Sequence, residues 1–244
     1  MPKIVSPGKC RLCGQLVDKA RMSTHLKACV KRSAADTPDT PAAARRLHVL
    51  VEADCDPGYW LHMEVPAKAT FGKLDRVLRD IWLECCGHMS AFRFHRKRVP
   101  RVSHGDFAPM IAALAQRGFE DELEDEQRLM DEAVGKRLQP GVKLQYEYDF
   151  GSTTELSLHV LDERPSSLAK PKIRLLARNE APTIACAACG KPATQVCAQC
   201  LWDGGGWLCE GCVPDHECGE EMVMPIVNSP RTGVCGYTGP SVEP

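Results

Sequence analysis

Long apolar runs are absent from this sequence, which limits the kind of protein it encodes. No stretch approaches the roughly 18 consecutive apolar residues that a membrane-spanning helix requires. The first residues, Met1 to Pro7, also lack the apolar centre of a secretory signal. We therefore expect a soluble, cytoplasmic protein without a membrane partner.

The sequence has almost no net charge, so the chain as a whole lacks the strong basicity that is typical of nucleic-acid-binding proteins. The formal net charge is -1. The distribution is uneven, because residues 1–48 contain ten Lys and Arg against three acids, whereas residues 120–132 contain eight acids and one Arg. The basic segment is suited either to contact DNA or RNA phosphates or to form a solvated surface, and the sequence leaves both open.

Catalytic motifs are also lacking. His62, His88, Asp149 and His159 are the residues that suggest acid or base chemistry. However, no nucleophile, base and orienting group occur at a motif spacing. We predict no catalytic residues and no enzyme activity, and a hydrolase is the least favoured hypothesis. Asp149 is expected in a hairpin turn, and the histidines are expected to pack or to form hydrogen bonds.

Cysteine, in contrast, is abundant. Eleven of the 14 cysteines lie within residues 1–30 or 186–235. In a cytoplasmic chain, cysteines grouped as Cys-x2-Cys are typical of metal ligands rather than of disulfides. The three cysteines between the two clusters, Cys55, Cys85 and Cys86, are expected to be small buried apolar residues.

The first cluster has the spacing of a structural zinc site with four ligands. Its members are Cys10, Cys13, His25 and Cys29. On a helix, His25 and Cys29 share one face because they are four residues apart. Zinc favours such a closed tetrahedral set of sulfur and nitrogen ligands. Few apolar residues lie between the ligands, so we expect folding of this segment to depend on the metal.

The second cluster offers enough ligands for two tetrahedral ions. Its eight members form four successive pairs: Cys186 and Cys189, Cys197 and Cys200, Cys209 and Cys212, His216 and Cys218. We favour an interleaved arrangement, in which the first and third pairs hold one ion and the second and fourth pairs hold the other. A sequential arrangement is the alternative. With the first cluster, the sequence predicts about three zinc ions per chain. Cys235 is left over and is expected to be a small buried residue rather than a further ligand.

The C-terminal pattern resembles MYND-type and B-box-type zinc modules over about 35 residues, although its internal spacings differ from both. This resemblance implies a role in protein–protein contact. Trp202 and Trp207 flank a glycine-rich turn between the second and third cysteine pairs. The two tryptophans either present an exposed aromatic contact or cover the small zinc core.

Between the clusters, the alternation and spacing of apolar residues predict an α+β domain with a mainly antiparallel sheet on one long helix. Strands are expected at 47–53, 59–65, 90–99, 143–150, 155–161 and 173–177. The long helix is expected from an N-cap at Thr70 to about Cys86. Short helices are expected at 106–118 and 127–138. The acidic run 120–126 is expected to be a solvated loop, and Gly151-Ser152 a hairpin turn.

Four segments of this domain resemble the plasmid pRiA4b ORF-3-like family, which is sometimes described as transposon passenger proteins. They are Asp56–Pro66, Thr70–Leu74, His88–Phe92 and the Tyr-x-Tyr-Asp-Phe-Gly motif at 146–151. The resemblance spans about residues 45–180 and implies a ubiquitin-like α+β fold without an established activity. The family continues the last motif with an acid and a tryptophan, which are missing after Gly151. A surface that depends on those two residues would be lost in this chain.

These observations predict four regions: a zinc knuckle at 1–32, a linker at 33–44, the α+β domain at 45–180, and a two-zinc module with a tail at 181–244. The leading hypothesis is a zinc-binding, non-enzymatic adaptor that contacts a protein partner. The alternative is a nucleic-acid-binding accessory protein of a mobile element, acting through residues 1–48. Neither the partner nor the oligomeric state follows from the sequence.

Overall fold

The computed structural model describes residues 6–35, 44–94, 119–166 and 172–240. The predicted helix at 106–118, most of the predicted linker and residues 95–99 of a predicted strand lie outside these ranges. Within the described residues, no helix combines the length and the apolar character needed to cross a membrane.

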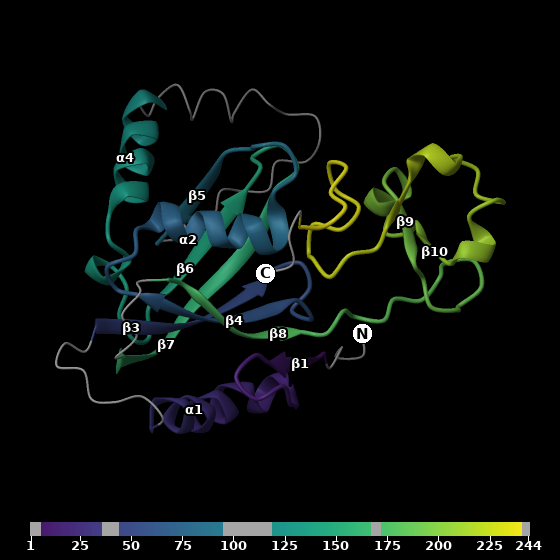
Figure 1. Cartoon of the computed structure of the whole chain (residues 1–244). Coiled ribbons are helices and arrows are strands. Elements are labelled where there is room, and N and C mark those ends of the chain that lie inside the picture. Colours follow the sequence, from purple (N-terminus) through teal and green to yellow (C-terminus); the bar gives the residue numbers. More distant parts are fainter. Residues whose placement is uncertain (1–5, 36–43, 95–118, 167–171, 241–244) are drawn as a thin grey trace.

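An eight-stranded sheet forms the centre of the molecule (Figure 1). Its strands are β1 (Pro7–Cys10), β2 (Leu16–Asp18), β3 (Ala44–Ala53), β4 (Trp60–Pro66), β5 (Ser90–Arg93), β6 (Lys143–Tyr148), β7 (Thr154–Ser166) and β8 (Arg174–Asn179). The order is β2-β1-β8-β4-β3-β7-β6-β5, and the described pairings are antiparallel. The α+β class with a mainly antiparallel sheet is therefore confirmed. The N-terminal hairpin continues this sheet through the pairing of β1 with β8.

One face of the sheet packs against helix α2 (Phe71–Leu78). Side chains alternate along a strand, so Leu47, Val49 and Val51 of β3 all point into this core. Thr70 is the N-cap, as predicted, and its side chain accepts a hydrogen bond from the backbone N–H of Lys73. The helix continues as a π-helical turn, Arg79–Leu83, and so ends three residues before the predicted end. The likeness to ubiquitin stays a prediction.

The opposite face packs against helix α1 (Lys19–Ala35), which carries two of the predicted zinc ligands (Figure 1). Met22 and Leu26 of this helix share a buried cluster with Trp60 of β4. Strand β4 is buried along its whole length because a helix lies over each face. Gly8 of β1 permits the close approach to β8 and to the Trp60 ring of β4, since a Cβ there would lie 2.6 Å from the carbonyl oxygen of Arg178 and would clash with that ring.

Three predictions about local structure differ from what the structure shows. The acidic run 120–126 is helical, as part of α4 (Phe119–Asp131). Glu and Leu favour helices. Leu129 and Met130 at the end of α4 also pack against the main core, which stabilises the helix. The predicted helix at 127–138 consists of the end of α4 and a 3-10 turn, Val134–Lys136. The predicted linker begins later than expected, because α1 continues to Ala35, and it ends where β3 starts at Ala44.

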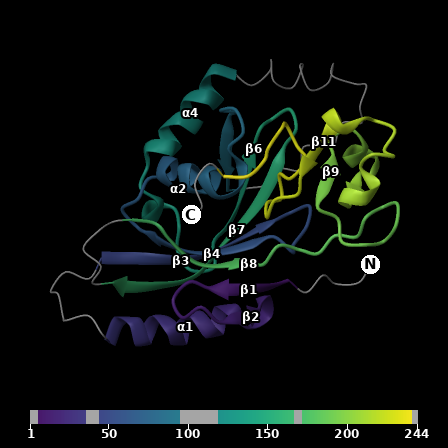
Figure 2. The same cartoon turned by 45° about the vertical axis from the view of Figure 1, so that its right-hand side comes forward.

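The C-terminal part forms a small module beside the sheet, and its tail then returns to the sheet (Figure 2). The module contains β9 (Gln195–Cys197), β10 (Trp207–Leu208) and β11 (Val223–Pro225), in the order β10-β9-β11, with short 3-10 turns at Cys200–Asp203, Glu210–Cys212 and Glu220–Met222. In the tail, the Ser229 hydroxyl donates a hydrogen bond to the carbonyl of Trp82, 2.6 Å away. The tail is therefore attached to the end of the α2 segment.

Candidate metal centres

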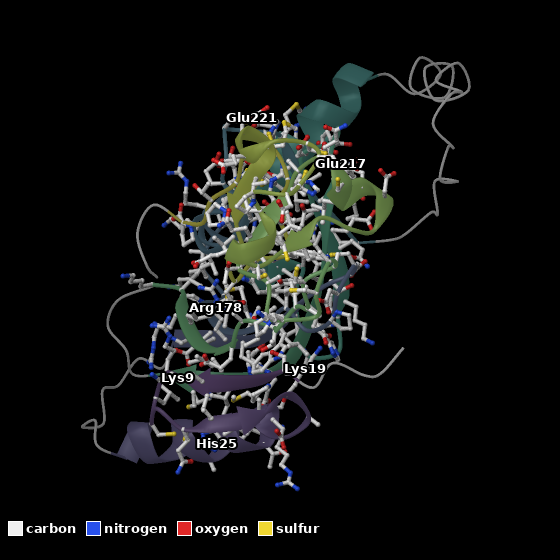
Figure 3. The ribbon with its side chains drawn as sticks, turned by 90° about the vertical axis from the view of Figure 1, so that its right-hand side faces the viewer. Lys9, Lys19, His25, Arg178, Glu217 and Glu221 are labelled. Carbon is white, nitrogen blue, oxygen red and sulfur yellow. The ribbon has the colours of Figure 1, made fainter. Side chains whose placement is uncertain are left out.

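The first predicted ligand set converges at one point, which we call site 1. Cys10 ends β1, Cys13 lies in the following turn, and His25 and Cys29 lie on α1. The Nε2 atom of His25 is 3.3 Å from the Cys13 sulfur and 3.2 Å from the Cys29 sulfur. Figure 3 shows His25 at the end of the molecule away from Glu217 and Glu221 of the C-terminal module.

The eight C-terminal candidates form two groups. Site 2 comprises Cys186, Cys189, Cys209 and Cys212, and site 3 comprises Cys197, Cys200, His216 and Cys218. The structure therefore places the side chains as in the interleaved alternative. The Cys200 sulfur lies 3.5 Å from that of Cys218 and 3.6 Å from Nε2 of His216.

These distances are those of a tetrahedral zinc site. Zn–S bonds of about 2.3 Å and Zn–N bonds of about 2.0 Å place two sulfurs about 3.8 Å apart and a sulfur and a nitrogen about 3.5 Å apart. Each group also uses four protein ligands, which fills the coordination sphere. Sites 1 to 3 can therefore hold a metal ion, and their ligand count is that of structural rather than catalytic zinc.

The thiols of sites 1 to 3 ionise unequally. A hydrogen bond from the backbone N–H of Cys209 lowers the pKa of Cys186 to about 6, whereas a hydrogen bond to Cys189 raises the pKa of Cys212 to about 12. In site 1, burial raises the pKa of Cys10 to about 11. Neighbouring thiolates repel one another, so the thiols of one group become ionised together only around a cation.

Sequence reasoning missed a fourth group, which we call site 4. Cys85, Cys86 and His88 follow α2, and Cys235 reaches them from the tail. Cys86 and Cys235 are exposed, so the expectation of small buried residues was wrong for these two, whereas Cys85 is partly buried and packs against the main core. The expectation was also wrong for Cys55, which is exposed. Residues 88 and 235 are too far apart in the sequence to form a recognisable motif, and they come together only in the folded structure.

A weaker signal was nevertheless present in the sequence. Each of the five Cys-Gly pairs of the chain has its cysteine in one of the four groups, and each glycine has a positive φ: Gly14, Gly87, Gly190, Gly219 and Gly236. Glycine adopts this left-handed conformation without steric cost, which allows a sharp turn directly after a ligand. Two of the five pairs belong to site 4.

Two of the residues that suggested acid or base chemistry, His62 and Asp149, make contacts that indicate a structural role. His62 is buried beside His48, with 2.9 Å between Nδ1 of His62 and Nε2 of His48. Burial lowers the pKa of His62 to about 3 and that of His48 to about 4, so both are neutral. Asp149 serves the hairpin turn as predicted, because its Oδ1 accepts hydrogen bonds from the backbone N–H groups of Gly151 and Ser152.

A groove of about 920 Å³ lies where the sheet, the C-terminal module and the tail meet. Its acidic lining residues are Glu52, Asp54, Asp56 and Glu155, and none of the described residues that line it is Lys or Arg. The module contributes Trp207 and also Trp202, whose side chain is 65% exposed. Of the two sequence alternatives for these tryptophans, the exposed contact fits Trp202.

No protein-family model and no curated protein matches the chain. Among solved structures, the crystal structure of a protein of unknown function, MM3350 from Methanosarcina mazei Go1, is similar over 56% of this chain and 70% of that chain. The two share 13% sequence identity, with a TM-score of 0.38. At so low a TM-score the match supports no inference. Membership in the pRiA4b ORF-3-like family therefore stays a prediction.

Proposed function

We propose that this protein is a zinc-stabilised, non-enzymatic adaptor that binds a cationic segment of a protein partner. The groove between the sheet and the C-terminal module is the observation that supports this proposal, because it combines four acidic side chains with an exposed tryptophan.

In this proposal, zinc at sites 1 to 3 has a structural role. Each site offers four sulfur or nitrogen ligands, which leaves no position for a reactive water. The proposed stoichiometry for these sites is three ions per chain. Zinc at sites 2 and 3 holds the module, and the module presents Trp202 and Trp207 to the groove.

The chemistry of the groove favours Lys or Arg side chains. Carboxylates attract a positive charge and speed its encounter with the surface. An indole face adds a cation–π contribution of roughly 0.5–2 kcal/mol, depending on solvent exposure. The volume also lies within the roughly 300–1,000 Å³ of ligand sites, which suffices for two or three side chains of an extended segment.

The test is a titration of the zinc-loaded protein with three short peptides of equal length that are rich in Arg, rich in Glu, or neutral. The two tryptophans outside the groove, Trp60 and Trp82, are fully buried, so a change in fluorescence reports mainly on Trp202 and Trp207. We expect the Arg-rich peptide to bind at least tenfold more tightly than the others, and Trp202→Ala to remove most of that difference.

Carboxylate variants refine the test. Asp54→Asn with Asp56→Asn should weaken binding of the Arg-rich peptide several-fold, because both residues line the groove. The matched control is Asp125→Asn, an exposed carboxylate on α4 that should have no effect. Equal affinity for the three peptides, or equal losses in the groove and control variants, would contradict the proposal.

Nucleic-acid binding through residues 1–48 is the second candidate, and its support is the set of exposed cations around site 1, including Lys9, Arg11 and Arg21. Two other cations of this region are engaged by the sheet, Lys19 with Glu52 and Lys27 with Asp162. Gel-shift assays at low salt distinguish the two proposals. A shift that is lost in Arg11→Glu with Arg21→Glu, without a peptide preference, would select nucleic acid.

A further inference from the structure

We propose that site 4 is a fourth zinc site, which joins the C-terminal tail to the loop after α2. Its ligands are the thiolates of Cys85, Cys86 and Cys235 and the imidazole of His88. The argument for this site does not rest on the adaptor proposal, although Val234, the neighbour of Cys235, lines the groove.

The first support is geometric. The Cys86 sulfur is 3.8 Å from that of Cys85 and 3.7 Å from that of Cys235, close to the edge of about 3.8 Å expected between two zinc-bound sulfurs. Nε2 of His88 is 3.0 Å from the Cys86 sulfur and 3.3 Å from the Cys235 sulfur. The two sulfurs at 3.7 Å are also much too far apart for a disulfide, which requires about 2.05 Å.

The second support is the local backbone. Cys86 and Cys235 each precede a glycine with positive φ, as do the ligands Cys13, Cys189 and Cys218 of the other sites. Site 4 thus repeats twice the turn that accompanies each of the other groups. The repetition is unexpected for two unrelated exposed cysteines.

The third support is backbone strain. Among the described residues, Asp149 and Cys235 are the two non-glycine residues with positive φ, at 63° and 50°. Both lie at site 4, where Oδ2 of Asp149 is 3.5 Å from Nε2 of His88. Such left-handed conformations are sterically unfavourable for residues with a side chain, and they persist where the surrounding structure holds them in place. At Cys235, the strained turn directs the sulfur toward Cys86 and His88.

The fourth support is the surrounding charge. Arg231 is fully buried, and its Nη2 lies 3.6 Å from the Cys85 sulfur and 2.6 Å from Oδ2 of Asp149. Three thiolates, a neutral imidazole and Zn²⁺ carry a net charge of -1, and an N–H donor such as Arg231 stabilises that excess. Asp149 is saturated by Arg231 and by the hairpin amides, which leaves Cys85 as the better fourth ligand.

Site 4 would therefore attach the tail close to Arg231, which already holds the tail by hydrogen bonds. Arg231 donates hydrogen bonds to the carbonyl of Ser152 and to the hydroxyl of Thr154, which fixes the tail against the β6–β7 hairpin. Cys235 follows only four residues later. A zinc ion there would connect this tail to residues 85–88, so that the end of α2, the hairpin and the tail become one unit.

The experiment measures zinc per chain in the full-length protein, purified under reducing, anaerobic conditions and passed over a desalting column. We expect four zinc ions in the wild type and three in Cys235→Ser, in Cys86→Ser and in His88→Gln. The matched control is Cys55→Ser, because Cys55 is exposed and is the one cysteine outside the four groups. This variant should retain four.

A second measurement requires no variant. In the zinc-loaded wild type, alkylation by N-ethylmaleimide followed by peptide mapping should modify Cys55 at least tenfold faster than Cys86 and Cys235. All three are exposed, so this difference reports metal binding rather than burial. Equal alkylation rates, a wild type with three zinc ions, or a disulfide between Cys86 and Cys235 would overturn the proposal.

Discussion

The middle domain and the C-terminal module obtain their stability in different ways. The sheet and α2 enclose a large apolar core that includes Trp82, Tyr146 and Leu158. In the C-terminal module, the buried cluster consists of Cys197, Leu208 and Val213, one of which is itself a candidate metal ligand. A module with so little apolar burial depends on cross-links, whereas the domain depends on packing.

The N-terminal module is intermediate between these two. It contains site 1, but Met22 and Leu26 also pack on Trp60 of the sheet, and β1 pairs with β8. A metal ion at site 1 would therefore add to a packed interface instead of replacing one. The comparison predicts that metal removal, core mutation, acid and surface-charge changes affect the three regions unequally.

The largest expected effect is that of metal removal. A chelator under reducing conditions should unfold the C-terminal module completely, because metal-binding energy is its folding energy. Amide hydrogen exchange should show loss of protection in β9 to β11, with protection retained in β3, β4 and β7. Zinc addition should restore the module. Simultaneous loss of protection in both regions would mean that the domain depends on metal as well.

Truncation of a core side chain should destabilise the middle domain rather than the C-terminal module. Leu158→Ala removes a fully buried side chain from β7 and should lower the free energy of unfolding of the middle domain by about 2–5 kcal/mol. The zinc content should stay that of the wild type. Denaturant unfolding measures the change, and Leu16→Ala, at a position that is 64% exposed, is the control and should change little.

Acid should destabilise the middle domain through its buried histidines. The pKa values of His48 and His62, about 4 and about 3, lie below that of an unfolded histidine, so the folded state binds fewer protons. The free energy of unfolding therefore falls as the pH decreases below about 6.5 and levels off once the pH is below the folded values. Between pH 7 and pH 5, we expect a loss of about 2 kcal/mol from His48 alone.

Comparison with His48→Gln separates this effect from protonation of the zinc thiolates. The variant keeps a polar group beside His62 but cannot titrate, so its stability should depend less on pH between 7 and 5. Loss of zinc with acid should be the same in both proteins. An identical pH dependence of unfolding would mean that the buried pair does not titrate as described.

The smallest expected effect concerns the N-terminal module. Nζ of Lys19 lies 2.5 Å from Glu52 and donates a hydrogen bond to the carbonyl of Pro57, yet the lysine is partly exposed. Lys19→Met should cost only about 0.2–1 kcal/mol, since exposed ion pairs contribute little. It also unmasks Glu52 at the groove, so the Arg-rich peptide should bind more tightly. A loss above about 2 kcal/mol would show that this ion pair, rather than strand pairing, attaches the module.

The local elements and ligand groups could be predicted from the sequence because their signals are short. Alternating apolar residues gave β3, β4, β6 and β7, and the Thr70 cap gave the start of α2. Cys-x2-Cys spacing gave sites 1 to 3. Helix α4 was missed because its many charges suggested a loop. Its residues nevertheless form a helix, because they have a high helix propensity and the end of the helix contacts the core.

Long-range relations could not be predicted. The pairing of β1 with β8, the return of the tail and site 4 each join residues that are more than a hundred positions apart. No periodicity records such a contact. The burial of Arg231 could not be predicted either. A single arginine in a Ser-Pro-Arg-Thr segment is typical of an exposed loop, yet Arg231 is completely buried beside Asp149.

The pairing of β1 with β8 also sets an order of events during synthesis. Gly8 pairs with Asn179, so the edge of the N-terminal hairpin has no partner until most of the chain has left the ribosome. The ligands of site 1 are complete at residue 29, long before β8 exists. If site 1 binds a metal ion, the hairpin and α1 can close around it first and form a unit before β8 is synthesised. Closure of a contact with such a large sequence separation is slow, and it is the step that we expect to limit the rate of folding.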